Sequence, residues 1–159
     1  MMTSIAEHFA LVGDKFAADT ETALAPKCFE GRKQVRLFQA WSPSHSFWLD
    51  LAQLDDDDWS ELKVCLENPG LHTIWQNAAF DIRVLQGCGI NLGGQFDDTM
   101  LMSWLLNNGI PTIKNSLAAI AYREVGVKLD KTLQSQNWMT AELNDEDMAY
   151  AMGDVEITW

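Results

Sequence analysis

The sequence has little of what builds thiolate metal centres or membrane spans. Its three cysteines (Cys28, Cys65 and Cys88) and three histidines lack the spacing of a zinc site. The scattered cysteines are typical of reduced, structural thiols, which favours a cytoplasmic setting. No apolar run reaches the roughly 18 residues of a membrane span, and the first residues do not form a signal-peptide pattern. We therefore expect no membrane association.

Positive charge is also scarce. The chain carries 11 Lys and Arg against 23 Asp and Glu, a formal net charge of −12. This balance argues against broad electrostatic capture of duplex nucleic acid. It does not exclude a site that grips phosphates through metal ions, because the acids that hold such ions themselves make a chain acidic.

The sequence shows no internal repeat, low-complexity tract or Pro/Gly-rich linker. With 159 residues, of which 47% are hydrophobic, it predicts a single domain over 1–159. A helix expected from Asp145 onward runs to Trp159, which follows Asp154 by only five residues. We therefore expect the sequence to be a fragment of a longer protein, cut at its C-terminal end.

The chain is organised around the stretch from Phe16 to Thr22, where a short apolar run meets two acids. In a strand, Asp19 and Glu21 project from the same face, and the neighbouring small residues Ala17 and Ala18 suit a covered central strand. Two carboxylates about 4 Å apart repel each other by about 4 kcal/mol at an effective dielectric of 20. Either one stays protonated or a cation sits between them. Taken alone, the pair is also compatible with a solvated surface strand.

The rest of the chain predicts an α/β fold. Residues 3–12 form a short helix or an edge strand, and 23–33 and 128–138 are loops. Strands at 35–40 and 46–49 are expected to form a hairpin, and a further buried strand is expected at 72–76. Helices are expected after the acidic run 55–58, from about Ala79 to Gly87, over 100–106 with Asp97 or Asp98 as its cap, and over 116–125 with Asn115 as its cap. The first three strands should be antiparallel and the later ones joined through helices.

Two of the expected helices carry further candidate residues. Asp81 falls on the apolar stripe of its helix with Val84 and Leu85, so it faces the core side. A capping role at the helix start explains it equally well. Tyr150 and Asp154 are spaced i, i+4 on the last helix, which Asn144 should cap. A core aromatic at helical spacing is the alternative for Tyr150.

Three segments together are specific. They run from Asp19 to Thr22, from Asn77 to Asp81, and from Tyr150 to Asp154, and they resemble, in order and spacing, the three exonuclease motifs of the DEDD superfamily of 3′–5′ exonucleases. The third motif has Tyr four residues before its Asp, and in this it resembles the tyrosine branch of the superfamily. That branch contains ribonuclease D and the proofreading domain of family A DNA polymerases. The resemblance implies a ribonuclease H-like α/β fold with a mixed central sheet, antiparallel in its first three strands, and helices packed on it.

The resemblance also implies roles for single residues. Asp19, Glu21 and Asp154 would ligate the more tightly held of two divalent cations, with Asp19 bridging to the second. Asp81 would hold the second cation, directly or through water, and Tyr150 would orient the attacking water. Contacts to the substrate are implied for three residues: Asn77, Thr20 and Leu24, the last as a wedge between terminal bases. An all-carboxylate site fits Mg²⁺ or Mn²⁺.

These inferences predict a two-metal phosphodiester hydrolase acting on a single-stranded 3′ end. The first hypothesis is the DNA proofreading domain of a family A-type DNA polymerase, with the polymerase following it in the full-length protein. The second is RNA 3′-end trimming of the ribonuclease D type, with an RNA-binding domain downstream; a stretch resembling ribonuclease D, Leu129 to Trp138, favours it. The third is an inactive module that only binds nucleic acid, against which the complete set of motif residues argues.

Overall fold

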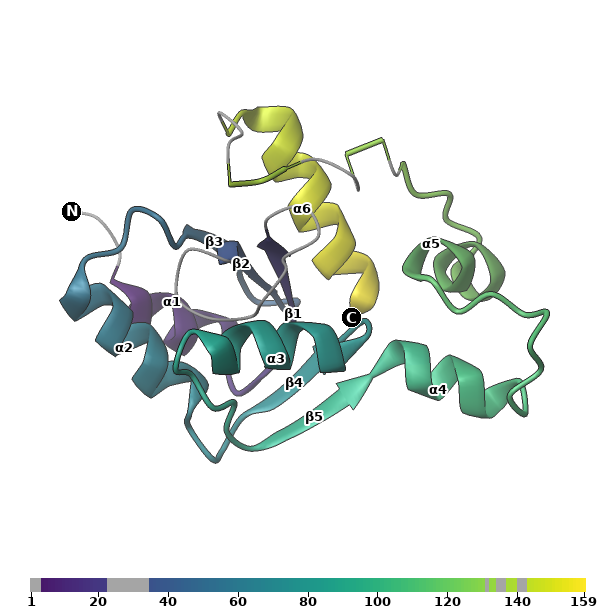
Figure 1. Cartoon of the computed structure of the whole chain (residues 1–159), viewed down its shortest axis with the longest axis horizontal. Helices are drawn as coiled ribbons and strands as arrows, with labels where there is room; N and C mark the ends of the chain where they lie inside the picture. Colours follow the sequence, from purple (N-terminus) through teal and green to yellow (C-terminus); the bar gives the residue numbers. More distant parts are fainter. Residues whose placement is uncertain (1–3, 23–34, 131, 134–136, 140–142) are drawn as a thin grey trace.

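A computed structural model gives the architecture of the chain (Figure 1). It describes residues 4–22, 35–130, 132–133, 137–139 and 143–159. Its elements in chain order are α1 (Ile5–Val12), β1 (Lys15–Thr22), β2 (Val35–Trp41), β3 (Ser46–Asp50), α2 (Asp56–Leu66), β4 (His72–Trp75), α3 (Ala78–Gly87), β5 (Gln95–Asp98), α4 (Thr99–Leu106), α5 (Leu117–Ile120), the π-helix η2 (Ala121–Val125) and α6 (Asp145–Thr158).

Five strands form one mixed sheet in the order β3-β2-β1-β4-β5. The pairs β1–β2 and β2–β3 are antiparallel, whereas β1–β4 and β4–β5 are parallel. This arrangement confirms the expected antiparallel start and the later strands joined through helices. The fifth strand was not predicted. Strand β1 lies at the centre of the sheet. Its side chains alternate between the two faces, so helices packed on either face can contact it.

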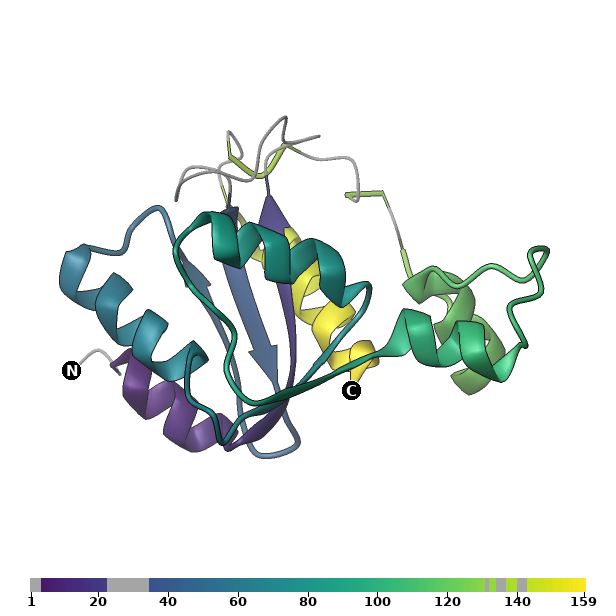
Figure 2. The ribbon, with the colours of Figure 1, turned by 60° about the horizontal axis from the view of Figure 1, so that its bottom comes forward.

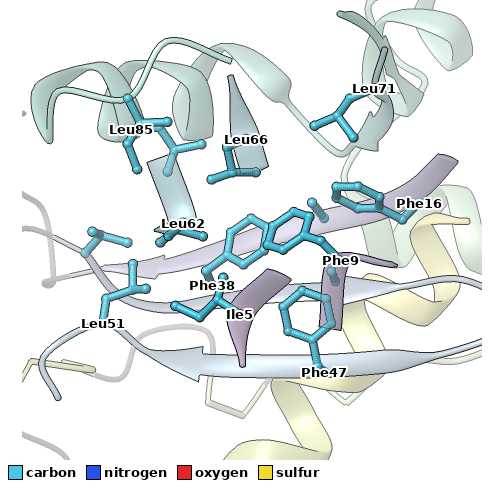
Figure 3. Packing of buried hydrophobic residues seen from close by; sticks show 14 of the residues in the cluster. Ile5, Phe9, Phe16, Phe38, Phe47, Leu51, Leu62, Leu66, Leu71 and Leu85 are labelled. Carbon is cyan, nitrogen blue, oxygen red and sulfur yellow. The ribbon is translucent and has the colours of Figure 1, made fainter. Parts of the chain in front are cut away.

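One face of the sheet carries the main hydrophobic core. Phe16 and Phe38 project from β1 and β2 toward α1 and α2, where Phe9 and Leu62 meet them (Figure 3). The ring of Phe9 lies 5.7 Å from that of Phe16 in an edge-to-face arrangement. Helix α3 closes the same core through Leu85, which is fully buried. Three helices therefore cover this face.

The opposite face is covered by α6. Figure 1 shows α6 and α3 on opposite sides of β1. Alternate residues of the strands contact α6: Ala17 packs with Val155, and Leu37 packs with Ala151. These clusters are smaller than the core under α1 to α3. Because side chains alternate along β1, Asp19 and Glu21 lie on the α6 face, with Ala17.

Helices α4 and α5 lie at the end of the molecule away from α1 and α2 (Figure 2). The sequence predicts one helix over 116–125, and the structure has a short α5 followed by the π-helix η2. The expected cap was wrong: Ser116, not Asn115, is at the N-cap position. The side chain of Asn115 instead accepts a hydrogen bond of 2.7 Å from the hydroxyl of Ser103. No helix within the described ranges is long and apolar enough to cross a membrane.

Candidate active site

Asp19 and Glu21 stand near the C-terminal end of the central strand. In the ladder with β2, Asp19 is opposite Gln39 and Glu21 is opposite Leu37. The register shifts between Glu21 and Thr22, where Arg36 of β2 is left without a partner residue in the ladder. Both acids are partly exposed, although their neighbours Ala18 and Thr20 are buried. The strand therefore presents two carboxylates at the edge of the core, as the sequence predicts.

Asp81 reaches the same strand from the other side of the sheet. It lies in the first turn of α3 and is only 2% exposed. Its Oδ1 accepts two hydrogen bonds from Thr20, one from the backbone N–H at 3.1 Å and one from the hydroxyl at 2.6 Å. The expected core-facing position of Asp81 is thus confirmed, and Thr20 fixes its carboxylate beside Asp19.

A second carboxylate, Asp98, holds the start of α3. It caps α4 by accepting from Met100 and Leu101, which confirms one of the two predicted caps. The same carboxylate accepts from the backbone N–H groups of Asn77 and Ala78, at 3.1 and 2.9 Å. Asp98 therefore joins the N-termini of α3 and α4, and so fixes the turn that carries Asp81. The sequence does not predict this second role, because the partners lie about 20 residues away.

Helix α6 supplies the remaining candidate residues. Asn144 begins it with a capping box, accepting from Glu146 and Asp147 while Asp147 accepts from the Asn144 N–H. The predicted cap is confirmed. One face of α6 is buried through Ala151 and Val155, which leaves Asp154 and Tyr150 partly exposed beside β1.

The aromatic ring of Tyr150 packs against the buried Trp138, with 6.2 Å between ring centroids. Its hydroxyl makes a hydrogen bond with Asp154. Burial raises the pKa of Tyr150 above its ordinary value, and the negative charges of Asp154, Glu21 and Asp19 raise it further. The phenol therefore stays protonated at neutral pH, so Tyr150 can donate a hydrogen bond but is not a base.

Burial and the neighbouring negative charges raise the pKa of two of these carboxyl groups. Burial is the largest cause that raises the pKa of Asp19 well above its usual range, followed by the charges of Asp81, Glu21 and Asp154. Burial likewise raises the pKa of Asp81 to about 7, against the hydrogen bonds from Thr20. Without a cation, the site therefore disfavours its own ionised form.

Two hollows flank Asp154. One, of about 360 Å³, lies where β1, α4, α5 and α6 meet the turn before α3, and its lining includes Asp19, Asn77, Met100, Ser116, Leu117 and Asp154. The other, of about 520 Å³, lies on the Tyr150 side of α6 and is lined by Leu129, Asp130, Thr132, Tyr150, Gly153 and Asp154. The carboxylates thus border open space on both sides, where an extended chain could enter.

The donor set fits divalent cations. The groups whose charges converge on Asp19 are all carboxylates, and oxygen ligands are those that Mg²⁺ and Mn²⁺ prefer. Cations would also remove the mutual repulsion that raises these pKa values. Across the described residues, no three His, Cys, Asp or Glu side chains already stand in an arrangement that would hold a metal ion.

The three residues expected to contact substrate have different positions. Asn77 precedes α3 in the left-handed conformation (φ 64°), is exposed, and lines the smaller hollow beside Asp19. Thr20 is buried, and its hydroxyl donates a hydrogen bond to Asp81. Leu24 lies outside the described residues. The substrate contacts of all three stay predictions.

The sequence pattern of the 3′–5′ exonuclease family matches residues 3–159, nearly the whole chain. The chain belongs to this family. DNA polymerase I of Aquifex aeolicus is 29% identical over 122 residues, which cover 77% of this chain and 20% of that polymerase. DNA polymerase I of Synechocystis is 40% identical over 68 residues, which cover 38% of this chain and 7% of that polymerase. The chain therefore spans a fifth or less of the length of these relatives.

Two solved structures, one of them an exoribonuclease, share the fold. Escherichia coli RNase D superposes with a TM-score of 0.77 at 23% identity, covering 98% of this chain and 41% of RNase D. Brucella melitensis NrnC with bound Mg²⁺ superposes with a TM-score of 0.71 at 22% identity, covering 93% of this chain and 69% of NrnC. The expected ribonuclease H-like α/β fold is confirmed.

Proposed function

We propose that this chain is a 3′–5′ exonuclease that removes nucleotides from single-stranded DNA ends by hydrolysis, releasing nucleoside monophosphates. Membership of the exonuclease family supports the reaction. The observation that carries the proposal is the convergence of charge from Asp81, Glu21 and Asp154 on Asp19, next to a hollow of about 360 Å³.

Two divalent cations, Mg²⁺ or Mn²⁺, are the cofactors of this proposal. Asp19, Glu21 and Asp154 would hold one ion, and Asp19 with Asp81 the other. When bound, such a pair lowers the pKa of water and stabilises charge on the phosphate oxygens. The all-oxygen donor set supports the assignment, as does the NrnC relative solved with Mg²⁺.

Other residues of the chain would orient the attacking water, position a carboxylate and contact the substrate. The protonated hydroxyl of Tyr150, packed on Trp138, orients the attacking water by a hydrogen bond. Thr20 holds the carboxylate of Asp81 in place. Asn77 contacts the terminal nucleotide from the mouth of the smaller hollow, where its side chain makes no capping hydrogen bond. Leu24 follows β1 and is proposed to wedge between the terminal bases.

We further propose that the chain is the proofreading domain of a DNA polymerase of family A type. The polymerase relatives support this reading: each is much longer than the stretch that matches this chain. The single-stranded DNA 3′ end is then the substrate and the polymerase the covalent partner. The free thiol of Cys65 fits the reducing cytoplasm.

RNA 3′-end trimming of the ribonuclease D type is the second candidate. The structural likeness to RNase D over 98% of this chain favours it. An RNA-binding domain would then follow the exonuclease domain. An inactive module that only binds nucleic acid is the third.

One assay separates the three. The chain is incubated with 5′-labelled single-stranded DNA or RNA of the same sequence in Mg²⁺, beside Asp19→Ala. We expect stepwise shortening from the 3′ end that prefers DNA and disappears in the variant. Faster shortening of RNA supports the ribonuclease D reading. No shortening, or shortening that Asp19→Ala leaves unchanged, contradicts the exonuclease proposal.

A further inference from the structure

Gln39 is a buried polar side chain that the mechanism above does not use. It is 0% exposed, on β2 in the middle of the sheet. Neither Nε2 nor Oε1 of its amide has a hydrogen-bond partner among the described residues. Buried polar groups are nearly always paired, since leaving one unpaired is destabilising. Its presence therefore calls for a partner that forms in another state of the site.

The position of Gln39 in the sheet indicates that this partner is Asp19. The antiparallel register puts Gln39 directly opposite Asp19, and directly opposed side chains lie on the same face with Cβ atoms about 4.5–5.5 Å apart. The two flanking residues of β2 on that face are apolar: Leu37 packs with Ala151, and Trp41 packs with Val155. Gln39 thus lies at the seam between two apolar clusters beneath α6. The residues directly opposite Gln39 on the neighbouring strands are Asp19 of β1 and Trp48 of β3, and of these two side chains the Asp19 carboxylate is the one that accepts hydrogen bonds.

We propose that Gln39 is a positioning residue for Asp19. When Asp19 is ionised beside a bound cation, the Nε2 amide of Gln39 donates a hydrogen bond to its carboxylate. This contact fixes the rotamer of the Asp19 side chain, which would contact the ions. The inference rests on the proposed function, because it needs the cation-bound state. It also explains why a desolvated amide sits in an otherwise apolar seam.

The proposal makes two predictions of opposite sign for Gln39→Met, which keeps the length of the side chain and removes the amide. The metal-free variant should melt at a higher temperature than the wild type, because an unpaired buried amide is replaced by an apolar group. The same variant should bind Mn²⁺ about 10-fold or more weakly, as is typical when a group orienting a metal ligand is lost. Its kcat should fall with little change in KM.

Leu37→Met is the matched control. Leu37 lies two residues away on the same strand, is 0% exposed, and packs against the same helix. The change disturbs packing under α6 without touching an amide. We expect Mn²⁺ affinity within about twofold of the wild type, as volume-conserving apolar exchanges are well tolerated.

The test combines Mn²⁺ titration, followed by electron paramagnetic resonance of the free ion, with NMR of the side-chain amides during Mg²⁺ titration. The Gln39 amide signal is assigned by its loss in Gln39→Met. We expect it to move downfield as Mg²⁺ saturates the site, and not to move in Asp19→Ala. Unchanged Mn²⁺ affinity in Gln39→Met, equal weakening in Leu37→Met, or a signal that ignores Mg²⁺ would each overturn the proposal. If the wild type itself bound no Mn²⁺, the proposed function would fail as well, so the two failures are distinguishable.

Discussion

The two faces of the central sheet differ in what they bury. The face under α1, α2 and α3 buries one continuous apolar cluster that includes Phe9, Phe38 and Leu62. The face under α6 buries two small clusters, with Gln39 between them and Asp19 beside it. One strand, β1, serves both faces, because its side chains alternate between them.

The face under α1, α2 and α3 therefore mainly stabilises the fold, whereas the face under α6 carries the candidate active site. Apolar burial on the first face gives the sheet a rigid support. On the second face, repelling acids and an unpaired amide oppose folding until a cation is bound. Asp81 joins the two, since it comes from a helix of the first face and lies beside an acid of the second. Substitutions on the two faces should therefore have different consequences for folding and activity.

The largest effect is expected at the proposed metal ligands on the α6 face. Asp154→Asn removes one charge of the cation site and keeps the size of the side chain. We expect turnover of single-stranded DNA in Mg²⁺ to fall on the order of 10⁴-fold, about 5 kcal/mol in the transition state. The melting temperature without metal should not fall, because Asp154 repels Asp19. A loss below tenfold would exclude Asp154 as a ligand.

The next largest effect is expected on the opposite face, where Leu62→Ala opens a cavity in the continuous core. Leu62 is 0% exposed, so the free energy of unfolding should drop by about 2–5 kcal/mol. Urea unfolding measures this loss. At a temperature where the variant stays folded, kcat should match the wild type. A matching drop in kcat would show that the core face also shapes the site.

Asp81 should make metal-free stability depend on pH. Its pKa is raised to about 7 in the folded chain and is about 3.9 when unfolded, so its contribution to stability is complete below pH 4 and lost as pH rises through 7. Asp81→Asn removes this dependence. Between pH 5 and 8 in EDTA, we expect the wild type to lose about 3 kcal/mol more stability than the variant. Parallel unfolding curves for the two proteins would contradict the raised pKa.

The smallest effect comes from a matched pair of helix caps. Asp55 caps α2 on the core face, and Asn144 caps α6 on the other face. Replacing either with Ala should lower the free energy of unfolding by about 1 kcal/mol. Only Asn144→Ala should also weaken Mn²⁺ binding, because α6 carries Asp154. Equal Mn²⁺ affinity in both variants would show that loosening the first turn of α6 does not change the position of Asp154.

Much of this architecture follows from local patterns. The acidic run that begins α2, the cap at Asn144 and the apolar stripe beside Asp81 are local in sequence, and each predicted its element. Strand β5 was missed because its sequence, Gln95 to Asp98, has no apolar run. It forms by parallel pairing with β4, where His72 contacts Asp97 at 2.7 Å. Such pairing is not visible in the segment itself.

The candidate site divides in the same way. The motif acids could be found by spacing and resemblance, whereas their supports could not. Thr20 reaches across 61 residues to Asp81, and Asp98 reaches across about 20 to the start of α3. Gln39 gives no sequence signal, since an isolated Gln in a strand is unremarkable until its register and burial are known. Contacts between distant segments carry the information that spacing lacks.

The central claim is that side chains from β1, α3 and α6 together hold a pair of divalent cations. A crystal structure of the chain grown with Mn²⁺, with anomalous scattering to locate the ions, tests it most directly. The account predicts one Mn²⁺ in contact with Asp19, Glu21 and Asp154, and a second between Asp19 and Asp81. Manganese bound only elsewhere, for example along the acidic start of α2, would contradict it.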